Sequence, residues 1–417
     1  MSLASRLLLA AAFGALHSLA FLRPWAWPLQ LLAVAWLASQ ALRETPARAA
    51  AIGLAFGTAW LAAGTWWLYI SLHRYGGLPA WMTVLAVLGL SAFLSLYVAV
   101  AAGGVARWRS GRPGSDASLF AALWLLAELA RAWIFTGFPW LAAGYAHTDA
   151  PLVALAPWVG VYGIGFVAAL LAAWVAAWAL RGRGRGVAAA AGVAALLALL
   201  HALPIPNFSA PASTLGLTLL QGNVAQDEKF AVEHLPQALA WTQAQLLAAR
   251  GDLVVAPETV IPLLPSQLDP AYWQALLDHF RAGRQAALIG LPLGNDSAGY
   301  TNSAAGLSAD TAGLPDGYYR YDKHHLVPFG EFIPTGFRWF TELMHIPLGD
   351  FNRGPLVAPS FAVRSAAGQV ERVAANICYE DLYGEELAAR FVDPAQAPTL
   401  FVNISNIGWF GDTIAIG

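Results

Sequence analysis

The stretch "ANICYEDLYGE" at 374–384 contains the only cysteine of the 417-residue chain, Cys378. Two other short apolar runs also end in a side chain that could assist a thiol: "LVVAPE" ends in Glu258, and "YYRYDK" ends in Lys323. A carboxylate can accept the thiol proton, while an ammonium favours the thiolate and a developing oxyanion. Backbone N–H groups just after Cys378 could complete an oxyanion hole. These residue types predict a nucleophilic site.

Each of the three residues also has a purely structural interpretation. A lone cysteine that ends a β-type run is often a small buried apolar side chain. Glu258 could begin a helix, where a carboxylate complements the helix dipole, and Lys323 could lie at a solvated strand end. Three such residues at three separate strand ends favour the catalytic interpretation.

The elements that must position these residues alternate between strand-type and helix-type patterns. The helix-type stretches are "FAVEHLPQALAWTQAQLLAAR" and "AYWQALLDHFRAG". The strand-type runs that lead into polar loops are "TLGLTLLQGNV", "DLVVAPETVIP", "AALIGLPLG", "GYYRYDKHHLVPFGE", "ERVAANICYED" and "TLFVNISNIGWFG". This alternation predicts an α/β layered domain, in which polar groups gather at the carboxyl ends of strands.

The first half of the chain has a different composition, which predicts a membrane domain. The chain is 58% hydrophobic and only 12% charged, against about 25% charged in an ordinary soluble domain. A bilayer crossing needs about 20 apolar residues. We therefore expect seven transmembrane helices, at 7–22, 24–42, 49–72, 80–104, 118–138, 152–180 and 187–204.

The loop arginines predict the orientation of these helices. On the side of the N-terminus the loops contain Arg43, Arg48, Arg107, Arg109, Arg112, Arg181, Arg183 and Arg185, whereas the loops on the other side contain only Arg23 and Arg74. With the N-terminus in the cytoplasm, seven crossings put the remainder outside, which in a bacterium is the periplasm. The first span continues into more apolar sequence, so we expect it to be retained rather than cleaved as a signal peptide.

The predicted organisation is thus a membrane domain over 1–205, a Pro/Ser linker over 206–213 and an α/β domain over 214–417. The net charge of −2 indicates no class of partner. No basic cluster with interleaved aromatics indicates nucleic acid, and no Gly-rich phosphate loop or paired His and Cys spacing indicates a cofactor or metal. A single cysteine excludes an intramolecular disulfide.

Six motifs give the chain a resemblance to a known family. They are "TGFPWLAAGY" (136–145), "QGNVAQDEKF" (221–230), "APET" (256–259), "YDKHHLVPFGEFIP" (321–334), "ICYED" (377–381) and "NISNIGWFGD" (403–412). In this order, behind a multi-spanning half, they resemble the apolipoprotein N-acyltransferases, which are membrane members of the carbon–nitrogen hydrolase (nitrilase) superfamily. The resemblance covers essentially the whole chain.

The resemblance implies a polytopic helical membrane domain followed by a periplasmic domain with the nitrilase αββα sandwich, in the bacterial inner membrane. It implies a catalytic triad of Glu258, Lys323 and Cys378. The supporting or substrate-binding residues that it implies are Glu331, Tyr379, Glu380, Phe230 and Trp409. Its substrates would be a phospholipid acyl donor and an apolipoprotein with an N-terminal diacylglyceryl-cysteine, joined through an acyl-thioester enzyme and without a cofactor.

The sequence also departs from the family pattern. The position of Phe230 is commonly a tryptophan, which keeps an aromatic ring, and that of Ile407 is often an aspartate, so a binding role for that position is in doubt. The chain ends at Gly417, while the family continues through more of the sandwich and a last membrane helix. We therefore expect a chain that is truncated at its C-terminus.

Two other functions remain open from the sequence. The same triad would serve a membrane-anchored amidase or nitrilase that uses water as the acceptor, and only the products separate the two. Alternatively, the spans could form a lipid-binding or transport module with a non-catalytic outer domain, although no internal repeat supports this.

Glu128 and Arg131 are charged residues inside one apolar span, three positions apart and hence on one helix face. Charges at such depth are usually paired or functional. We favour a structural ion pair, with contact to a lipid headgroup as the alternative.

The apolar segment "FRWFTELMHIPLGDF" at 337–351 is expected to form a lid that dips into the membrane interface and keeps water from the thioester, with ordinary core packing as the alternative. Charged substitutions at Trp339 and Phe340 should then reduce phospholipid turnover while circular dichroism still reports a folded domain. Turnover at the wild-type rate would contradict the lid.

Overall fold

The computed structural model describes residues 2–211, 213–224, 226–229, 231–334 and 350–413. The chain divides into two compact units, one comprising Met1–Arg74, Leu78–Ala210 and Asp412–Gly417, the other comprising Tyr75–Gly77 and Pro211–Gly411. Between Ala202 and Leu217, the described residues form neither helix nor strand. This stretch includes the predicted linker. We describe the two units separately.

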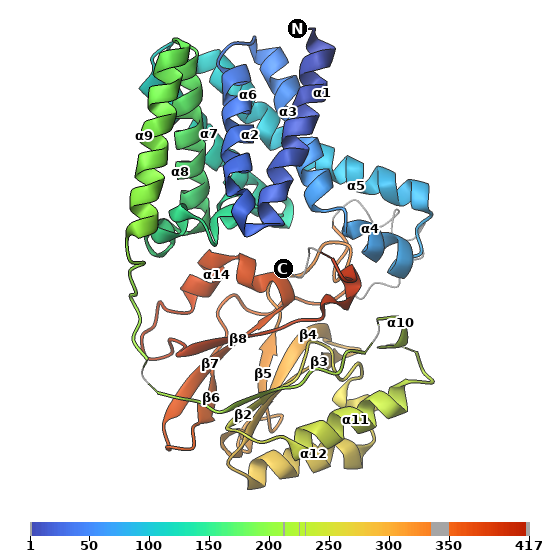
Figure 1. Ribbon diagram of the computed structural model, residues 1–417. Coiled ribbons are helices and arrows are strands. Elements are labelled where there is room, and N and C mark those ends of the chain that lie inside the picture. Colours follow the sequence, from blue (N-terminus) through green and yellow to red (C-terminus); the bar gives the residue numbers. More distant parts are fainter. Residues whose placement is uncertain (1, 212, 225, 230, 335–349, 414–417) are drawn as a thin grey trace. The chain divides into compact units, whose positions relative to one another are not determined.

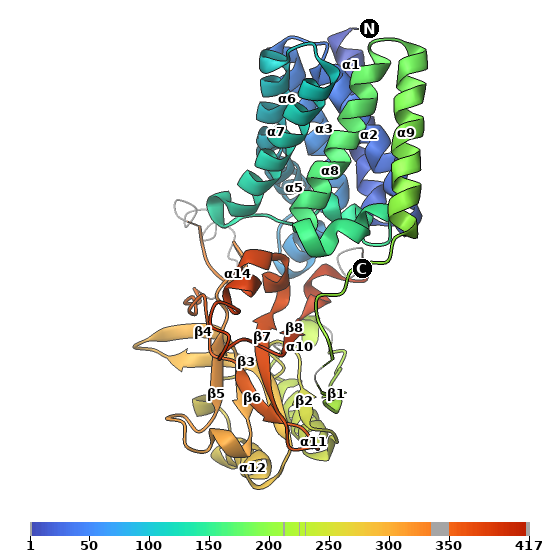
Figure 2. The same ribbon diagram turned by 90° about the vertical axis from the view of Figure 1, so that its left-hand side faces the viewer.

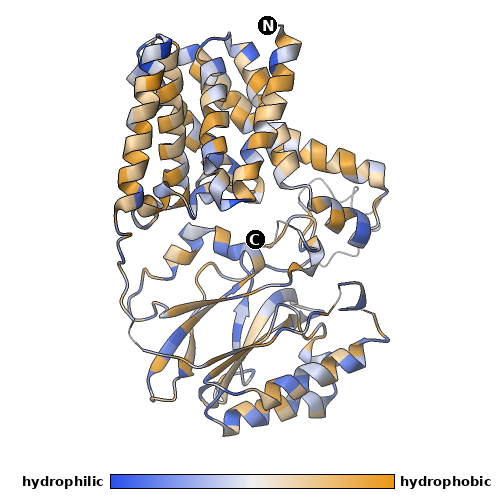
Figure 3. Ribbon diagram, in the orientation of Figure 1, coloured by the Kyte–Doolittle hydropathy of each residue, from blue (hydrophilic) through white to orange (hydrophobic). Residues whose placement is uncertain are grey.

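The first unit is entirely helical over its described residues (Figure 1). Its helices are α1 (Leu3–Ser18), α2 (Trp27–Ala41), α3 (Pro46–Gly64), α4 (Leu68–Ile70), α5 (Ala80–Leu94), α6 (Leu96–Trp108), α7 (Pro113–Trp133), α8 (Ala156–Ala179) and α9 (Arg183–Ala202). Apolar residues cover most of their surface (Figure 3). Such a bundle is expected where the surroundings are lipid rather than water.

Six helical segments in the described part of the chain are long and apolar enough to cross a membrane. The prediction of seven differs at 24–42, where α2 has only 15 residues. At 1.5 Å per residue, 15 residues reach about 22 Å, which is shorter than the roughly 30 Å of a hydrocarbon core, although α2 still runs from one end of the bundle to the other (Figure 1). The chain enters α2 through a separate 3-10 turn at Pro24–Ala26, which shortens the helix.

The predicted span at 80–104 is broken at Ser95 into α5 and α6. The side chains of Ser91 and Ser95 donate to the carbonyl oxygens four residues earlier, at 2.8 and 2.6 Å, a bond that bends helices. As a result α6 lies alongside α3 and α7, while α5 is directed away from the bundle (Figures 1 and 2).

Small residues let the helices of this unit approach closely. Alanines make up much of the buried core, among them Ala33, Ala38, Ala121 and Ala173. A Cβ atom at Gly14 of α1 would lie 2.1 Å from the carbonyl oxygen of Phe56 in α3. This packing is typical of membrane helices, because lipid provides little hydrophobic drive for their association.

Buried polar groups hold the loop between α7 and α8. The Glu128 carboxylate accepts the Ala143 N–H at 2.7 Å, and Gln30 of α2 donates to the Ala143 carbonyl at 2.7 Å. Arg131, only 2% exposed, lies 3.6 Å from Glu128 and donates to the Phe138 carbonyl at 2.9 Å. Glu128 and Arg131 are therefore a structural pair that positions the "TGFPWLAAGY" loop.

The second unit contains two β-sheets (Figure 1). The first sheet has the order β1 (Leu217–Leu219), β2 (Leu253–Val255), β3 (Ala286–Asn295), β4 (Gly299–Leu307) and β5 (Tyr319–Asp322). The second has the order β6 (Phe361–Arg364), β7 (Val370–Ile377) and β8 (Leu400–Ile404). Parallel pairs join β1 to β2, β2 to β3, and β7 to β8, and the other neighbours are antiparallel.

Alternating side chains of the first sheet form two cores. Val254 and Ile289 point toward helices α11 (Leu235–Ala248) and α12 (Pro270–Ala282), where they meet Leu246 and Phe280. On the opposite face, a second core joins the two sheets, with Leu253, Val255, Leu288 and Tyr321 from the first and Val373, Ile377 and Ile404 from the second. Helices, sheet and sheet are thus stacked in layers, which confirms the predicted α/β class.

Replacing Glu128 should destabilise the first unit. Glu128→Leu leaves the Arg131 guanidinium buried without its charge partner, a change that costs about 3–5 kcal/mol in unfolding free energy. Glu128→Gln keeps an acceptor for the Ala143 N–H and should lose less. Thermal unfolding in detergent measures both, and a Glu128→Leu protein as stable as the wild type would contradict the structural role.

Candidate active site

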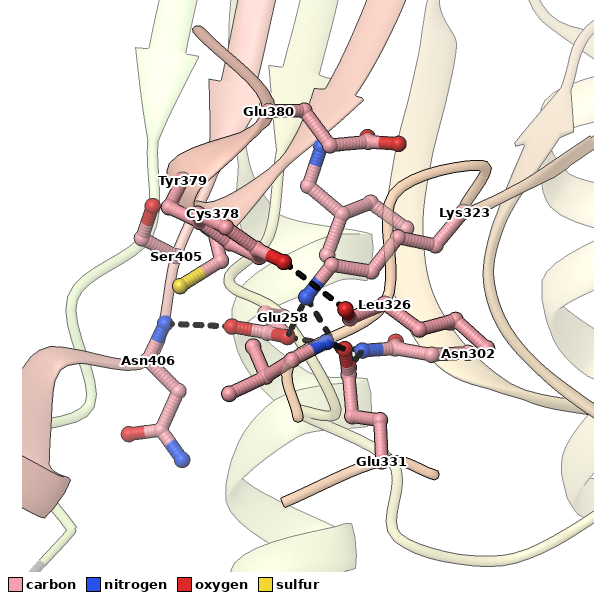
Figure 4. A network of polar contacts seen from close by, with 12 residues as sticks. Glu258, Asn302, Lys323, Leu326, Glu331, Cys378, Tyr379, Glu380, Ser405 and Asn406 are labelled. Carbon is pink, nitrogen blue, oxygen red and sulfur yellow. Dashed lines mark hydrogen bonds and ion pairs between the residues drawn. The ribbon is translucent and has the colours of Figure 1, made fainter. Parts of the chain in front are cut away.

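The three predicted catalytic residues lie at the ends of three strands that share one core. Glu258 follows β2 by three residues, and Lys323 directly follows β5 in the same sheet. Cys378 directly follows β7 in the other sheet, and Val255, Tyr321 and Ile377 all belong to the core between the sheets. The face-to-face packing of the sheets brings the three side chains into one cluster (Figure 4).

Cys378 is the first residue of a 3-10 turn, Cys378–Leu382, that directly follows β7. Its φ of 58° is unusual for a residue other than glycine. Such strain is kept only where the surroundings enforce it, and it is concentrated at functional sites. Asn403 supports the turn by donating its side-chain amide to the Cys378 carbonyl at 2.7 Å. Cys378 as a residue is intermediate in exposure, and its sulfur points toward Glu258 and Asn406 (Figure 4).

Two hydrogen bonds fix the Glu258 carboxylate. One oxygen accepts from the Asn302 side chain at 2.8 Å, and the other accepts the backbone N–H of Asn406 at 2.8 Å. Strand β3 also passes very close: a Cβ atom at Gly290 would lie 2.3 Å from the Pro257 carbonyl oxygen and 2.7 Å from the Glu258 Cα. The carboxylate therefore has one orientation, and only glycine fits at 290.

The Lys323 ammonium is enclosed by two carboxylates and a ring. Its Nζ lies 2.9 Å from Glu331 Oε1 and 3.7 Å from Glu258 Oε1, and the residue is 1% exposed. The Tyr379 ring lies 5.5 Å from Nζ, within cation–π range. The other Glu331 oxygen accepts the Val327 N–H at 2.8 Å. The Glu331 carboxylate therefore binds both the Lys323 ammonium and the backbone of the loop that follows Lys323.

Asn302, which the sequence analysis missed, also belongs to this cluster (Figure 4). Its amide nitrogen on β4 donates to Glu258 at 2.8 Å and to Glu331 at 2.6 Å, and therefore links the two carboxylates that flank Lys323. Asn406 was also missed as a residue, although its motif "NISNIGWFGD" was recognised. The available signal for Asn302 was a polar side chain in the middle of a run of small, strand-compatible residues.

Tyr379 and Glu380 support the site from directly behind the cysteine. The Tyr379 hydroxyl donates to the Leu326 carbonyl at 2.8 Å. Glu380 accepts the N–H groups of His324 and His325 at 2.8 and 3.1 Å, the Tyr321 hydroxyl at 2.7 Å and the Ile377 N–H at 2.7 Å. Glu380 thus joins the loop that carries Lys323 to the turn that carries Cys378.

The remaining predicted residues have different outcomes. Trp409 lies on an exposed 3-10 turn at Ile407–Phe410, next to Asn406, and Ile407 is exposed as well. Phe230 and the segment around Trp339 and Phe340 lie outside the described residues. Among the described residues, no cluster of three or more His, Cys, Asp or Glu is arranged to hold a metal ion.

Comparison with known proteins adds an independent observation. The family model "Apolipoprotein N-acyltransferase N-terminal domain" matches residues 13–174. The chain is 52% identical over its full length to "Apolipoprotein N-acyltransferase" of Verminephrobacter eiseniae, of which it covers 80%. It is 44% identical over 98% of its length to the protein of that name from Ralstonia nicotianae, of which it covers 77%. The chain belongs to the apolipoprotein N-acyltransferase family.

A solved carbon–nitrogen hydrolase from Helicobacter pylori G27 is also similar to this member of the apolipoprotein N-acyltransferase family. The alignment covers 46% of this chain and 59% of the hydrolase, with 19% sequence identity and a TM-score of 0.27.

The electrostatics of the cluster decide which groups carry protons at rest. Burial opposes the charge on Lys323, but Glu331, Glu258 and Cys378 outweigh it and raise the pKa of the ammonium above its usual value. For Cys378, burial together with the charges of Glu258 and Glu331 raises the pKa to about 12, although Lys323 and the Tyr379 N–H act in the opposite direction. At neutral pH the cluster therefore holds an ammonium and a neutral thiol.

The sign of each charge effect can be tested by alkylation of Cys378 with iodoacetamide, which reacts with the thiolate. In the wild type the rate should keep rising above pH 9, since the pKa of Cys378 is about 12. Glu258→Gln removes the larger negative contribution, so it should lower that pKa and speed alkylation at pH 8. Lys323→Met should slow it. Equal rates in all three proteins would contradict this charge arrangement.

Proposed function

We propose that this protein transfers an acyl chain from a phospholipid to the N-terminal amine of a diacylglyceryl-modified apolipoprotein, through an acyl-thioester on Cys378. The observation that carries the proposal is the enclosed cluster of Glu258, Lys323 and Cys378 in a chain of the apolipoprotein N-acyltransferase family. A neutral thiol needs a base at the moment of attack, and Glu258 is oriented for that role by Asn302 and Asn406.

In the first half-reaction, Glu258 takes the proton of the Cys378 thiol while the sulfur attacks the phospholipid ester carbonyl. The Lys323 ammonium and the Tyr379 N–H stabilise the oxyanion. When the carbon–oxygen bond breaks, the leaving alkoxide of the lysophospholipid takes the proton from Glu258. The enzyme then carries the acyl chain as a thioester.

In the second half-reaction, the amine of the apolipoprotein cysteine attacks the thioester carbonyl, and Glu258 receives a proton from the nitrogen. The carbon–sulfur bond breaks, an amide forms, and Cys378 recovers its proton from Glu258. Splitting one difficult exchange into two steps in this way is characteristic of covalent catalysis. Glu331, Tyr379 and Glu380 act as positioning residues, and Phe230 and Trp409 are proposed to contact substrate.

The helical unit has a physical purpose in this scheme. Pulling an acyl chain out of a bilayer costs roughly 0.8 kcal/mol per CH₂, which a membrane-embedded enzyme avoids. We take residues 1–205 as the membrane domain and 214–417 as the catalytic domain. The arginines in the loops on the N-terminal side support an inner-membrane protein with its catalytic domain in the periplasm.

Intact-mass spectrometry of the purified protein after incubation with a phospholipid tests the first half-reaction. We expect a gain of one acyl chain that hydroxylamine removes and that a Cys378→Ala protein lacks. Adding a diacylglyceryl-cysteine peptide should then discharge the adduct to an N-acyl peptide. Release of free fatty acid at the same rate with and without the peptide would instead indicate a hydrolase. A folded wild-type protein that never acquires the adduct would contradict the proposal.

A further inference from the structure

A groove of about 520 Å³ lies between α7, α8 and α9 of the first unit. Its wall is formed mainly by apolar side chains, including Leu171, Trp174 and Val193, with Ser118 as a polar exception. At Gly192, a Cβ atom would meet nothing within 4 Å, so the groove is open at this level of α9. An apolar groove of this kind on a membrane-spanning unit fits a hydrocarbon chain.

Four arginines lie in the loops and the first turn of α9 at one end of this groove. Arg112 precedes α7, and Arg181, Arg183 and Arg185 lie at the junction of α8 and α9. The polar α8–α9 junction contrasts with the apolar helices that it joins (Figure 3). Arg181 donates to the Gly111 carbonyl, which ties the two loops together.

These arginines are not neutralised by the protein. Within the described residues, Arg112, Arg183 and Arg185 are exposed and form no ion pair. The nearby Asp116 carboxylate accepts the N–H and the hydroxyl of Ser110, at 2.6 and 3.0 Å. Asp116 is thus bonded to Ser110 and forms no ion pair with these arginines in the described residues, which leaves a strongly positive end.

Two helix N-termini reinforce this charge. Helices α7 and α9 both begin at this end, and neither has a side-chain hydrogen bond at its N-cap. The first N–H groups of a helix point outward and carry a partial positive charge, which favours phosphate. The groove, the arginines and the helix N-termini thus fit the two parts of a lipid, an acyl chain and a phosphate group.

We propose that this groove binds an anionic phospholipid, with an acyl chain between α8 and α9 and its phosphate among Arg112, Arg183 and Arg185. A net negative headgroup is favoured because the ammonium of a zwitterionic lipid would oppose the arginines. The chain leaves for the second unit from the other end of α9, at Ala202. We propose that this lipid is distinct from the acyl donor, and the inference does not depend on the triad.

Native mass spectrometry of the full chain in mixed micelles tests this site, with dioleoyl phosphatidylglycerol and dioleoyl phosphatidylcholine as probes. The wild type should retain phosphatidylglycerol in preference to phosphatidylcholine. Arg183→Gln/Arg185→Gln should weaken that binding about tenfold or more. The matched control is Arg43→Gln/Arg48→Gln, which removes one charge from the α2–α3 loop and one from the first turn of α3, at the same end of the bundle (Figure 1), and should leave the preference unchanged.

A second pair of variants tests the groove itself. Ala189 lines the groove, whereas Ala191, two positions along α9, is exposed outside it. Ala189→Phe should reduce phosphatidylglycerol retention severalfold, and Ala191→Phe should not. Equal retention of both lipids by the wild type, an equal loss in the two arginine variants, or no effect of Ala189→Phe would each overturn the proposal. Melting temperatures of the variants check that they are folded.

Discussion

An ammonium group removed from water must be neutralised by its neighbours, and Lys323 imposes this requirement on the whole catalytic unit. Two carboxylates from different loops meet at it, Glu258 at 3.7 Å and Glu331 at 2.9 Å. Because these carboxylates repel each other, they also need a shared donor, which is Asn302. Burial, together with the charges of these two carboxylates, then keeps the thiol of Cys378 protonated at rest. One buried cation thus gathers the two carboxylates that, together with burial, set the protonation state of Cys378.

Residues with a strong local signal could be predicted from the sequence. Each of the six strand-type runs contains a strand. Short runs of strand-forming apolar residues that are followed by a polar loop are a local signal, which can be recognised without knowledge of the tertiary structure. Glu258, Lys323 and Cys378 come together because each ends such a run. Glu331, Tyr379 and Glu380 were assigned through the family resemblance, and their positions beside the triad fit that assignment.

Strand β4 was missed, and with it Asn302. The run "GYTNSAAGL" has a centre of small residues, Ser303 to Gly306, which carries little strand signal. Tertiary packing accounts for at least one of them, because a Cβ atom at Gly306 would lie 2.9 Å from the Phe361 ring. The break of the 80–104 span at Ser95 and the short α2 were also not predicted. Both depend on backbone geometry that hydropathy does not report.

The protonated state of Cys378 has a consequence for its survival. Oxidants and stray disulfides attack thiolates far faster than thiols. With a pKa of about 12, the resting nucleophile is nearly inert toward them, and no second cysteine in the chain can trap it. Under the proposed mechanism the thiolate forms only while Glu258 accepts the proton, so the oxidation-sensitive form of Cys378 is short-lived.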